Sequence, residues 1–218
     1  EYVNDEETIV DIRKFNDKTL LITDKQFKII DSSGNNYGEY QFDDEVYDYM
    51  YDFDDDFVLR TDKHYVGFNT KKDIYKVIPI GQEIIKMDDK YFVFDFADMH
   101  EDSNYCTPDI YEIRMYDSEF NFLNSYETEF NWCGFYSSKL YDIGDDYLFS
   151  TYTANEEVLI VRFDKDLNVL KTSKAELTDG VVSNGFFTSF CHGEVCVFYS
   201  DYSEYTNNGK NVLISLGG

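Results

Sequence analysis

The sequence predicts an all-β protein built from a repeated unit, and three observations lead to this prediction. Tyr and Phe are abundant, with 20 and 19 of the 218 residues against 4 Met and 2 Pro, and aromatic residues favour strands over helices. No segment places its apolar residues at helical spacing between capping residues. Short apolar runs alternate instead with polar turns along the whole chain, as successive β-hairpins require.

The charge balance excludes several classes of partner. The chain carries 44 acidic and 19 basic residues, a formal net charge of -25, which phosphate backbones and anionic lipid head groups repel. No window approaches the roughly 20 consecutive apolar residues of a membrane span. We therefore expect no nucleic-acid partner, no membrane insertion and no organic cofactor, while the carboxylates leave open a bound calcium ion.

Two sequence signatures alternate along the chain. The first is a polar turn that runs into an apolar strand, and it occurs at residues 16–24, 53–62, 87–96, 143–152 and 191–200. The second is a strand that ends in a turn before another strand, and its turns are marked by Asp31, Asn69, Asp117 and Asp164. Asn and Asp suit such turns because they tolerate left-handed backbone and hydrogen-bond their own main chain. Each repeat is therefore expected to be a meander of four strands, A to D.

The fourth repeat illustrates the pattern, with strand A at 139–144, B at 146–153, C at 157–163 and D at 168–176. Repeated four-stranded meanders at this period resemble a β-propeller, without the marks of any specific propeller family. The resemblance implies one domain, residues 1–218, with blades at 6–45, 46–81, 82–130, 131–178 and 179–218. A β-sandwich, or a pair of β-domains, is the alternative fold.

The fifth blade lacks sequence for its outer strand. It is therefore expected to remain three-stranded, or to be completed either by the N-terminal residues 1–5 or by another chain. Completion by another chain would be self-association through an open sheet edge.

One face of this propeller is the predicted binding face, because B–C connections and D-to-A crossings share it. It carries the long connections 97–109 and 200–211, and the crossing that contains the only Trp. Exposed aromatic residues beside carboxylates suit a glycan or protein partner. The candidate ligand-binding residues are His100, Tyr105, Trp132, Tyr202 and Tyr205. The alternatives are that Trp132 fills the gap between two blades and that His100 is a solvated loop residue.

Two acidic runs resemble metal sites, and only the first is a candidate. Asp98, Glu101 and Asp102 lie within seven residues and supply enough oxygen donors for calcium, although their spacing is not that of an EF-hand loop. Residues 164–168 coincide with a repeated C–D turn, and we interpret them as turn chemistry.

An enzymatic alternative rests on carboxylates that would line the propeller channel. Residues 42–57 alternate apolar residues with Asp, so that Asp48 and Asp52 are expected to point inward with Asp11 and Asp142. Paired carboxylates are the machinery of glycoside hydrolases, provided that their separation is suitable. No serine-hydrolase, zinc-protease or phosphate-loop motif is present.

The four cysteines predict two disulfides. If Gly193 and Glu194 form a two-residue hairpin loop, Cys191 and Cys196 face each other at a non-hydrogen-bonded pair, within disulfide range. Cys106 and Cys133 are expected on one face of adjacent blades and form the second pair. Two complete pairs indicate an oxidising compartment, so the expected location is extracellular or on the cell surface.

The sequence thus favours a non-enzymatic, extracellular binding or assembly module that presents a rigid loop face to a glycan or protein. The alternatives are a five-bladed glycoside hydrolase and a structural subunit of a surface layer or filament.

Overall fold

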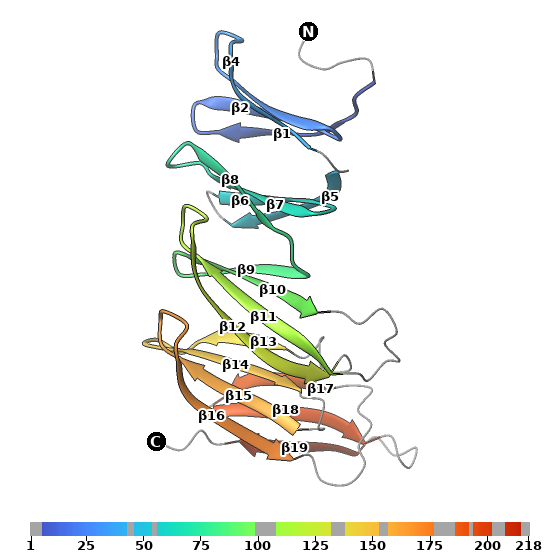
Figure 1. Ribbon diagram of the computed structural model, residues 1–218, viewed down its shortest axis with the longest axis vertical. Helices are drawn as coiled ribbons and strands as arrows, with labels where there is room; N and C mark the ends of the chain where they lie inside the picture. Colours follow the sequence, from blue (N-terminus) through green and yellow to red (C-terminus); the bar gives the residue numbers. More distant parts are fainter. Residues whose placement is uncertain are drawn as a thin grey trace. The chain divides into compact units, whose positions relative to one another are not determined.

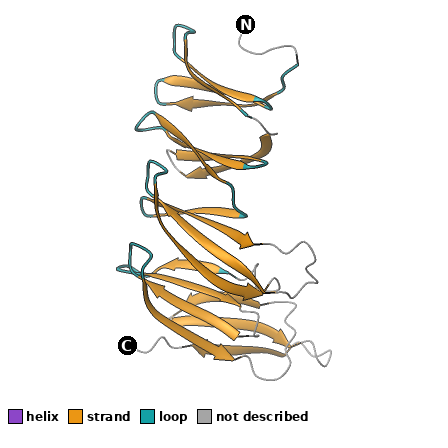
Figure 2. Cartoon of the chain, viewed as in Figure 1, coloured by secondary structure: helices purple, strands orange, loops and turns teal. Residues whose placement is uncertain are grey.

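A computed structural model describes residues 6–42, 46–53, 56–98, 108–131, 138–152, 157–176, 186–191, 194–201 and 208–214. These residues form strands and turns without a helix, as the sequence predicts (Figure 2). It follows that the described part of the chain offers no apolar helix of membrane-spanning length.

The described strands form antiparallel meanders in chain order (Figure 1). The first sheet contains β1 (Ile9–Phe15), β2 (Lys18–Thr23), β3 (Gln26–Ile30) and β4 (Asn36–Gln41). The second contains β5 (Val46–Phe53), β6 (Asp56–Thr61), β7 (His64–Asn69) and β8 (Ile74–Pro79). The third contains β9 (Glu83–Met87), β10 (Lys90–Asp98), β11 (Pro108–Tyr116) and β12 (Phe122–Asn131).

The later sheets follow the same order. The fourth contains β13 (Lys139–Asp142), β14 (Tyr147–Tyr152), β15 (Glu157–Phe163) and β16 (Val169–Glu176). The last described sheet has three strands, β17 (Phe186–Cys191), β18 (Glu194–Asp201) and β19 (Asn208–Ile214). The repeated four-stranded meanders confirm the predicted β-propeller repeat architecture.

The chain divides into two compact units. Unit 1 comprises Glu1–Asp95 and Met115–Phe122, and unit 2 comprises Phe96–Arg114 and Leu123–Gly218. The assignment of residues 1–218 to one domain stays a prediction. The first two sheets and the residues of the third that pack against them lie in unit 1, which also contains the site described below.

Three of the predicted C–D turns share one hydrogen-bonding pattern, in which an Asp carboxylate accepts bonds from its own turn. In the third sheet, Asp117 Oδ1 accepts from the backbone N–H groups of Glu119 and Asn121 at 2.8 and 2.9 Å, and Oδ2 accepts from the Asn121 side chain at 2.9 Å. The turns at Asp31 and Asp164 repeat these contacts. The interpretation of residues 164–168 as turn chemistry is therefore confirmed.

The residue before the Asn in each of these turns has left-handed backbone. Its φ is 84° at Gly34, 58° at Phe120 and 64° at Leu167. This is the three-residue hairpin loop in which a type I turn leads into a left-handed bulge residue. Glycine fills this position most easily, so an apolar side chain at Phe120 or Leu167 requires compensation by packing.

The turn carboxylates predict acid sensitivity. Burial raises the pKa of Asp117, but hydrogen bonds from Asn121 and Glu119 outweigh it and lower the pKa below 3.8. Because folding lowers the pKa of Asp117, its ionised carboxylate stabilises the fold fully at pH values above 3.8. This contribution is lost as the pH falls through the pKa of the folded state. Asp117→Ala should therefore cost about 1–2 kcal/mol at neutral pH and much less near pH 2, measured by urea denaturation.

The matched control for this test is Asp62→Ala, which removes an exposed carboxylate from the turn between β6 and β7. It should change the free energy of unfolding by less than about 0.5 kcal/mol. An equal loss from Asp117→Ala at both pH values would show that the charge of the carboxylate is not what stabilises the turn.

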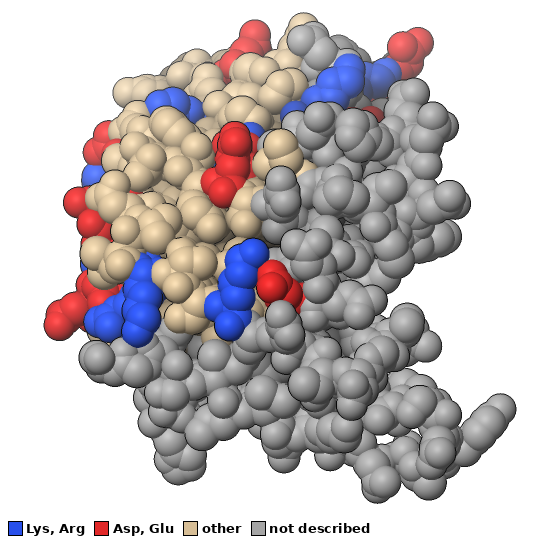
Figure 3. All heavy atoms as spheres, turned by 60° about the horizontal axis from the view of Figure 1, so that its bottom comes forward, with Lys and Arg blue, Asp and Glu red and all other residues tan. Residues whose placement is uncertain are grey.

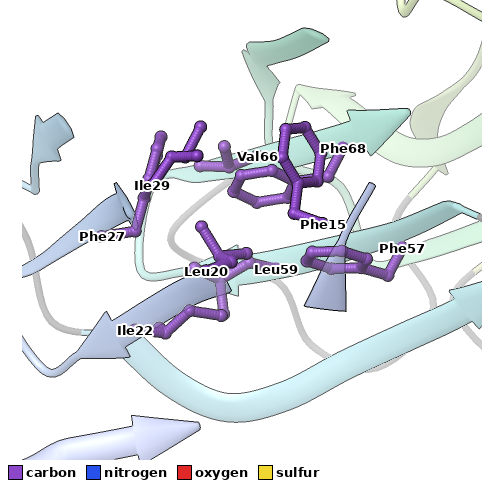
Figure 4. Close-up of a cluster of buried hydrophobic side chains, with 9 residues drawn as sticks. All are labelled: Phe15, Leu20, Ile22, Phe27, Ile29, Phe57, Leu59, Val66 and Phe68. Atoms are coloured by element: carbon purple, nitrogen blue, oxygen red, sulfur yellow. The ribbon is translucent and has the colours of Figure 1, made fainter. Parts of the chain in front are cut away.

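An apolar core joins the first two sheets (Figure 4). Strand alternation puts these side chains on the facing sides of both sheets, and each is at most 5% exposed. Phe68 lies centrally, stacked on Phe57 with ring centroids 4.6 Å apart and edge-on to Phe27 at 5.0 Å. The complete cluster is Phe15, Leu20, Ile22, Phe27, Ile29, Phe57, Leu59, Val66 and Phe68.

The other side of the second sheet has its own core. Val58, Tyr65 and Ile78 pack there with Tyr91 and other side chains of the third sheet. Phe120, the left-handed turn residue, stacks on Tyr91 with centroids 4.4 Å apart and lies directly over Gly67. The second sheet is thus apolar on both faces, as an internal blade must be.

The hairpin of β17 and β18 corrects one prediction. Cys191 pairs with Glu194, and Cys196 pairs with Ser189, so the two cysteines do not face each other. Cysteines displaced by two residues along a ladder are about 7–8 Å apart, outside the normal disulfide range. The register on which the Cys191–Cys196 disulfide was predicted is therefore wrong. Cys106 and Cys133 lie outside the described residues.

Candidate functional site

A groove of 530 Å³ opens on unit 1, at the edge of the first two sheets where the A–B and C–D turns meet. This edge lies opposite the B–C connections on which the sequence placed its binding face. The groove is lined by Arg13, Lys14, Asn16, Asp52, Asp56, Phe57, Thr70 and Lys71. It therefore combines charged, amide and hydroxyl groups above a buried aromatic ring.

Arg13 ties the two sheets together at the groove. Its Nε donates to Asp11 Oδ2 at 2.7 Å, and its terminal nitrogens donate to both carboxylate oxygens of Asp52. The guanidinium lies 5.0 Å above the ring of Phe57. Asp11 and Arg13 share a face of β1 because they are two residues apart, whereas Asp52 comes from β5.

The charge state of this cluster follows from these contacts. Burial lowers the pKa of Arg13, but the hydrogen bonds to Asp52 and Asp11 outweigh that effect and raise it. The permanently charged guanidinium thus contacts both carboxylates at once. The cluster therefore acts as a fixed ionic clamp.

Asp56 forms a second, more deeply buried network behind the groove. It begins β6, and its Oδ2 accepts from Lys86 Nζ and from Tyr91 Oη, both at 2.7 Å. Burial raises the pKa of Tyr91, and the hydrogen bond to Asp56 adds to this shift. Tyr91 is thus held as a neutral donor, and the Asp56 side chain, 7% exposed, is fixed from the third sheet.

Further ion pairs join neighbouring sheets along the same edge. Lys18 pairs with Asp73, and Lys72 Nζ lies 2.6 Å from Glu119 Oε1. The hydrogen bond from Lys18 to Asp73 raises the pKa of Lys18, and that from Lys72 to Glu119 raises the pKa of Lys72. Figure 3 shows one face of the molecule, on which Lys and Arg side chains lie beside Asp and Glu. The ion pairs of Lys18 with Asp73 and of Lys72 with Glu119 thus join neighbouring sheets at the turn edge through opposite charges.

The predicted channel carboxylates have different environments. Asp11 and Asp52 are brought together, but through Arg13. Asp142 belongs to unit 2, where it accepts from the Gly144 N–H and from Lys165 Nζ, each at 2.8 Å. Asp48 lies in β5, and its side chain is outside the described residues. In both described environments the carboxylate oxygens already accept hydrogen bonds within the protein.

The predicted ligand-binding residues His100, Tyr105, Trp132, Tyr202 and Tyr205 lie outside the described residues. So do Glu101 and Asp102, while Asp98 ends β10 without a described side chain. Within the described ranges, no three His, Cys, Asp or Glu side chains are grouped so that they could hold a metal ion. The calcium site and the loop face both stay predictions.

A smaller groove of 410 Å³ lies on the opposite edge of the first sheet, lined by Glu6, Glu7, Lys25, Gln26, Gln41 and Phe42. The Gln26 amide donates to both Glu7 oxygens at 2.7 and 2.8 Å. The Gln26 amide of this groove is therefore already engaged within the protein.

Arg13 is the residue at the centre of the 530 Å³ groove that the sequence did not single out. The signal was present, because Asp11 and Arg13 stand two apart in a predicted strand and must share its face.

No protein-family model and no curated protein sequence matches the chain. Among solved structures, a Bacteroides caccae protein of unknown function is similar at 16% identity and TM-score 0.38, covering 94% of this chain and 74% of that one. The WD40 domain of Neurospora crassa Pan2 is 8% identical at TM-score 0.37, covering 96% and 66%. The dihydro-heme d1 dehydrogenase NirN is 11% identical at TM-score 0.44, covering 95% and 47%.

Proposed function

We propose that the protein is a non-enzymatic binding module whose ligand occupies the groove between the first two sheets. The observation that carries the proposal is the Arg13 clamp, which joins both sheets beside a groove of 530 Å³. That volume lies in the range of small-ligand pockets, roughly 300–1,000 Å³. A site whose walls are locked by ion pairs and a shared core loses little entropy when it binds.

The same clamp argues against the glycoside-hydrolase alternative. Hydrolysis requires two carboxyl groups that reach the scissile bond, whereas oxygens of Asp11 and Asp52 already accept hydrogen bonds from Arg13. Their negative charge is used to position a cation between the two sheets. We therefore assign these aspartates a structural role in the groove wall.

The partner class, the location and the number of blades belong to the proposal as well. A glycan or protein ligand fits a polar groove, and an extracellular location would fit a surface receptor for either. We take the described sheets as the blades of one five-bladed propeller.

The three-stranded last sheet, with β19 at its described edge, favours a second candidate function, assembly through strand addition by another copy.

The test of the proposed function is binding to a panel of immobilised glycans and candidate surface proteins. The wild-type chain should bind a member of the panel, and Arg13→Gln should weaken that binding roughly tenfold because the groove wall loses its clamp. Lys25→Ala, on the opposite edge, is the matched control and should bind as the wild type does. Equal binding by Arg13→Gln and wild type would place the ligand elsewhere.

A further inference from the structure

The geometry points to a second binding surface on unit 1, an aromatic strip that fits a proline-rich segment carrying basic residues. The strip is formed by rings that reach the surface from β4, from the residue that follows β4 and from β8, namely Tyr37, Tyr40, Phe42 and Tyr75. These residues are not part of the lining of the groove at Arg13. The inference therefore goes beyond the proposed function and rests on different contacts.

The strip packs on the core that joins the first two sheets, because Tyr40 pairs across its ladder with Phe27. Tyr75 pairs with Phe68 in the second sheet, so it lies on the facing side. Tyr40 stacks on Phe27 with ring centroids 5.9 Å apart, and Tyr75 meets the same ring edge-on at 4.8 Å. Phe42 lies 5.7 Å from Tyr40, again between ring centroids. The outer strands of both sheets thus contribute to one continuous row of rings.

Tyr37 extends the strip to the start of β8. The Lys18 ammonium lies 4.4 Å from the centre of the Tyr37 ring and also pairs with Asp73, two residues before Tyr75. Tyr37 is 68% exposed and Tyr75 is 37% exposed. Tyrosine rings combine a large apolar area with a polar hydroxyl and are enriched at protein interfaces. The strip therefore combines exposed rings with partners in the core that hold it in place.

A row of tyrosine rings on an outer strand suits a polyproline II segment. Such a segment has no internal hydrogen bonds, so its prolines pack on aromatic rings while its carbonyl groups accept hydrogen bonds from hydroxyls. Strand addition to β4 is disfavoured, because the pairing of β3 with β4 shifts register between Ile29 and Ile30. A bulge of this kind twists a sheet edge away from a further strand. The segment therefore lies across the rings and does not extend the sheet.

Charge determines the second property of the partner. The strip leads through Phe42 into the groove of 410 Å³, whose lining places the carboxylates of Glu6 and Glu7 against the ammonium of Lys25. Lys25 Nζ donates to the backbone carbonyl of Glu6 at 3.2 Å. This acidic lining, on a chain with a formal net charge of -25, attracts a basic partner and repels a second copy of the chain. A Lys or Arg side chain of the partner therefore lies in this groove, beside the prolines on the rings.

Calorimetric titrations with short synthetic peptides test the inference. The probes carry proline at every third position, to match the polyproline II repeat, and arginines at one end or the other. They should bind at least roughly tenfold more tightly than the same peptides with alanine in place of proline. They should bind about threefold more tightly than peptides with glutamine in place of arginine.

Two variants locate the peptide on this surface. Tyr37→Ala should weaken binding of the arginine-containing probe about fivefold or more, because it removes the most exposed ring of the strip. Glu6→Gln should remove most of the preference for arginine over glutamine and keep the preference for proline over alanine. The matched control combines Phe122→Ala, which removes an exposed ring of another outer strand, with Asp62→Asn, and it should bind as the wild type does. Thermal denaturation establishes that each variant remains folded.

Arg13→Gln should leave peptide binding unchanged, so that this surface and the proposed function are tested separately. Equal affinity for the proline and alanine peptides, wild-type affinity in Tyr37→Ala, or no binding of any arginine-containing probe would overturn the inference. Dimerisation that Tyr37→Ala abolishes would assign the strip to a second copy of the chain, and glycan binding that it abolishes would assign the strip to a saccharide. Either result would overturn the peptide partner.

Discussion

Replacing Gly67 by alanine is expected to lower the free energy of unfolding by about 3 kcal/mol. A Cβ at this position of β7 would lie 2.4 Å from the ring of Phe120, a distance that real Cβ contacts essentially never show. The ring cannot move aside easily, because Phe120 is fully buried and stacks on Tyr91 with centroids 4.4 Å apart. Urea denaturation of the wild type and the variant measures the loss.

Gly38→Ala is the matched control, because a Cβ there meets Ile29 Cδ1 at an ordinary 3.6 Å. It should change stability by less than about 0.5 kcal/mol. Combining Gly67→Ala with Phe120→Leu should show a positive coupling, since the smaller side chain leaves room for the new methyl group. If Gly67→Ala alone is as stable as the wild type, Phe120 does not occupy this position.

The second large effect is expected at Asp56. Asp56→Ala should cost about 3 kcal/mol, because it leaves the ammonium of Lys86 and the buried hydroxyl of Tyr91 without the oxygen that both now contact at 2.7 Å. The measurement is again the midpoint and slope of urea denaturation.

Two further variants separate the parts of this network. Tyr91→Phe removes one neutral hydrogen bond and should cost only about 1 kcal/mol. Lys86→Met removes the cation, so that Asp56→Ala should cost less in this background than in the wild type. Equal costs in both backgrounds would mean that Asp56 and Lys86 are not coupled.

The sequence predicted the strands well because local chemistry determines them. The strand predicted at 157–163 is β15 itself, and the turn predicted at Asp164 exists because an Asp followed four residues later by an Asn can satisfy its own backbone. The register of the last hairpin could not be predicted in this way. Gly193 can stand in either position of a two-residue loop, and a shift by one residue changes every cross-strand pair.

The sequence predicted two aspartates of the site but not the residues that join them. Alternation along β1 and β5 predicted a common location for Asp11 and Asp52, and the two do come together, through Arg13. What joins them depends on packing between sheets, which places Arg13 over Phe57 and Asp56 against Tyr91. Such contacts link residues about 35 to 45 positions apart, and a single sequence does not reveal them. The residues expected on the loop face are outside the described ranges, so that face stays a prediction.

We propose that the Arg13 clamp makes Asp11 and Asp52 part of a binding site and not of a catalytic one. The most direct test is a reducing-sugar assay of the wild-type chain with the glycans that it binds, run beside Asp52→Asn and Asp142→Asn. The wild-type chain should bind these glycans and release no sugar above the rate of a protein-free control. Release of reducing sugar that either substitution abolishes would contradict it.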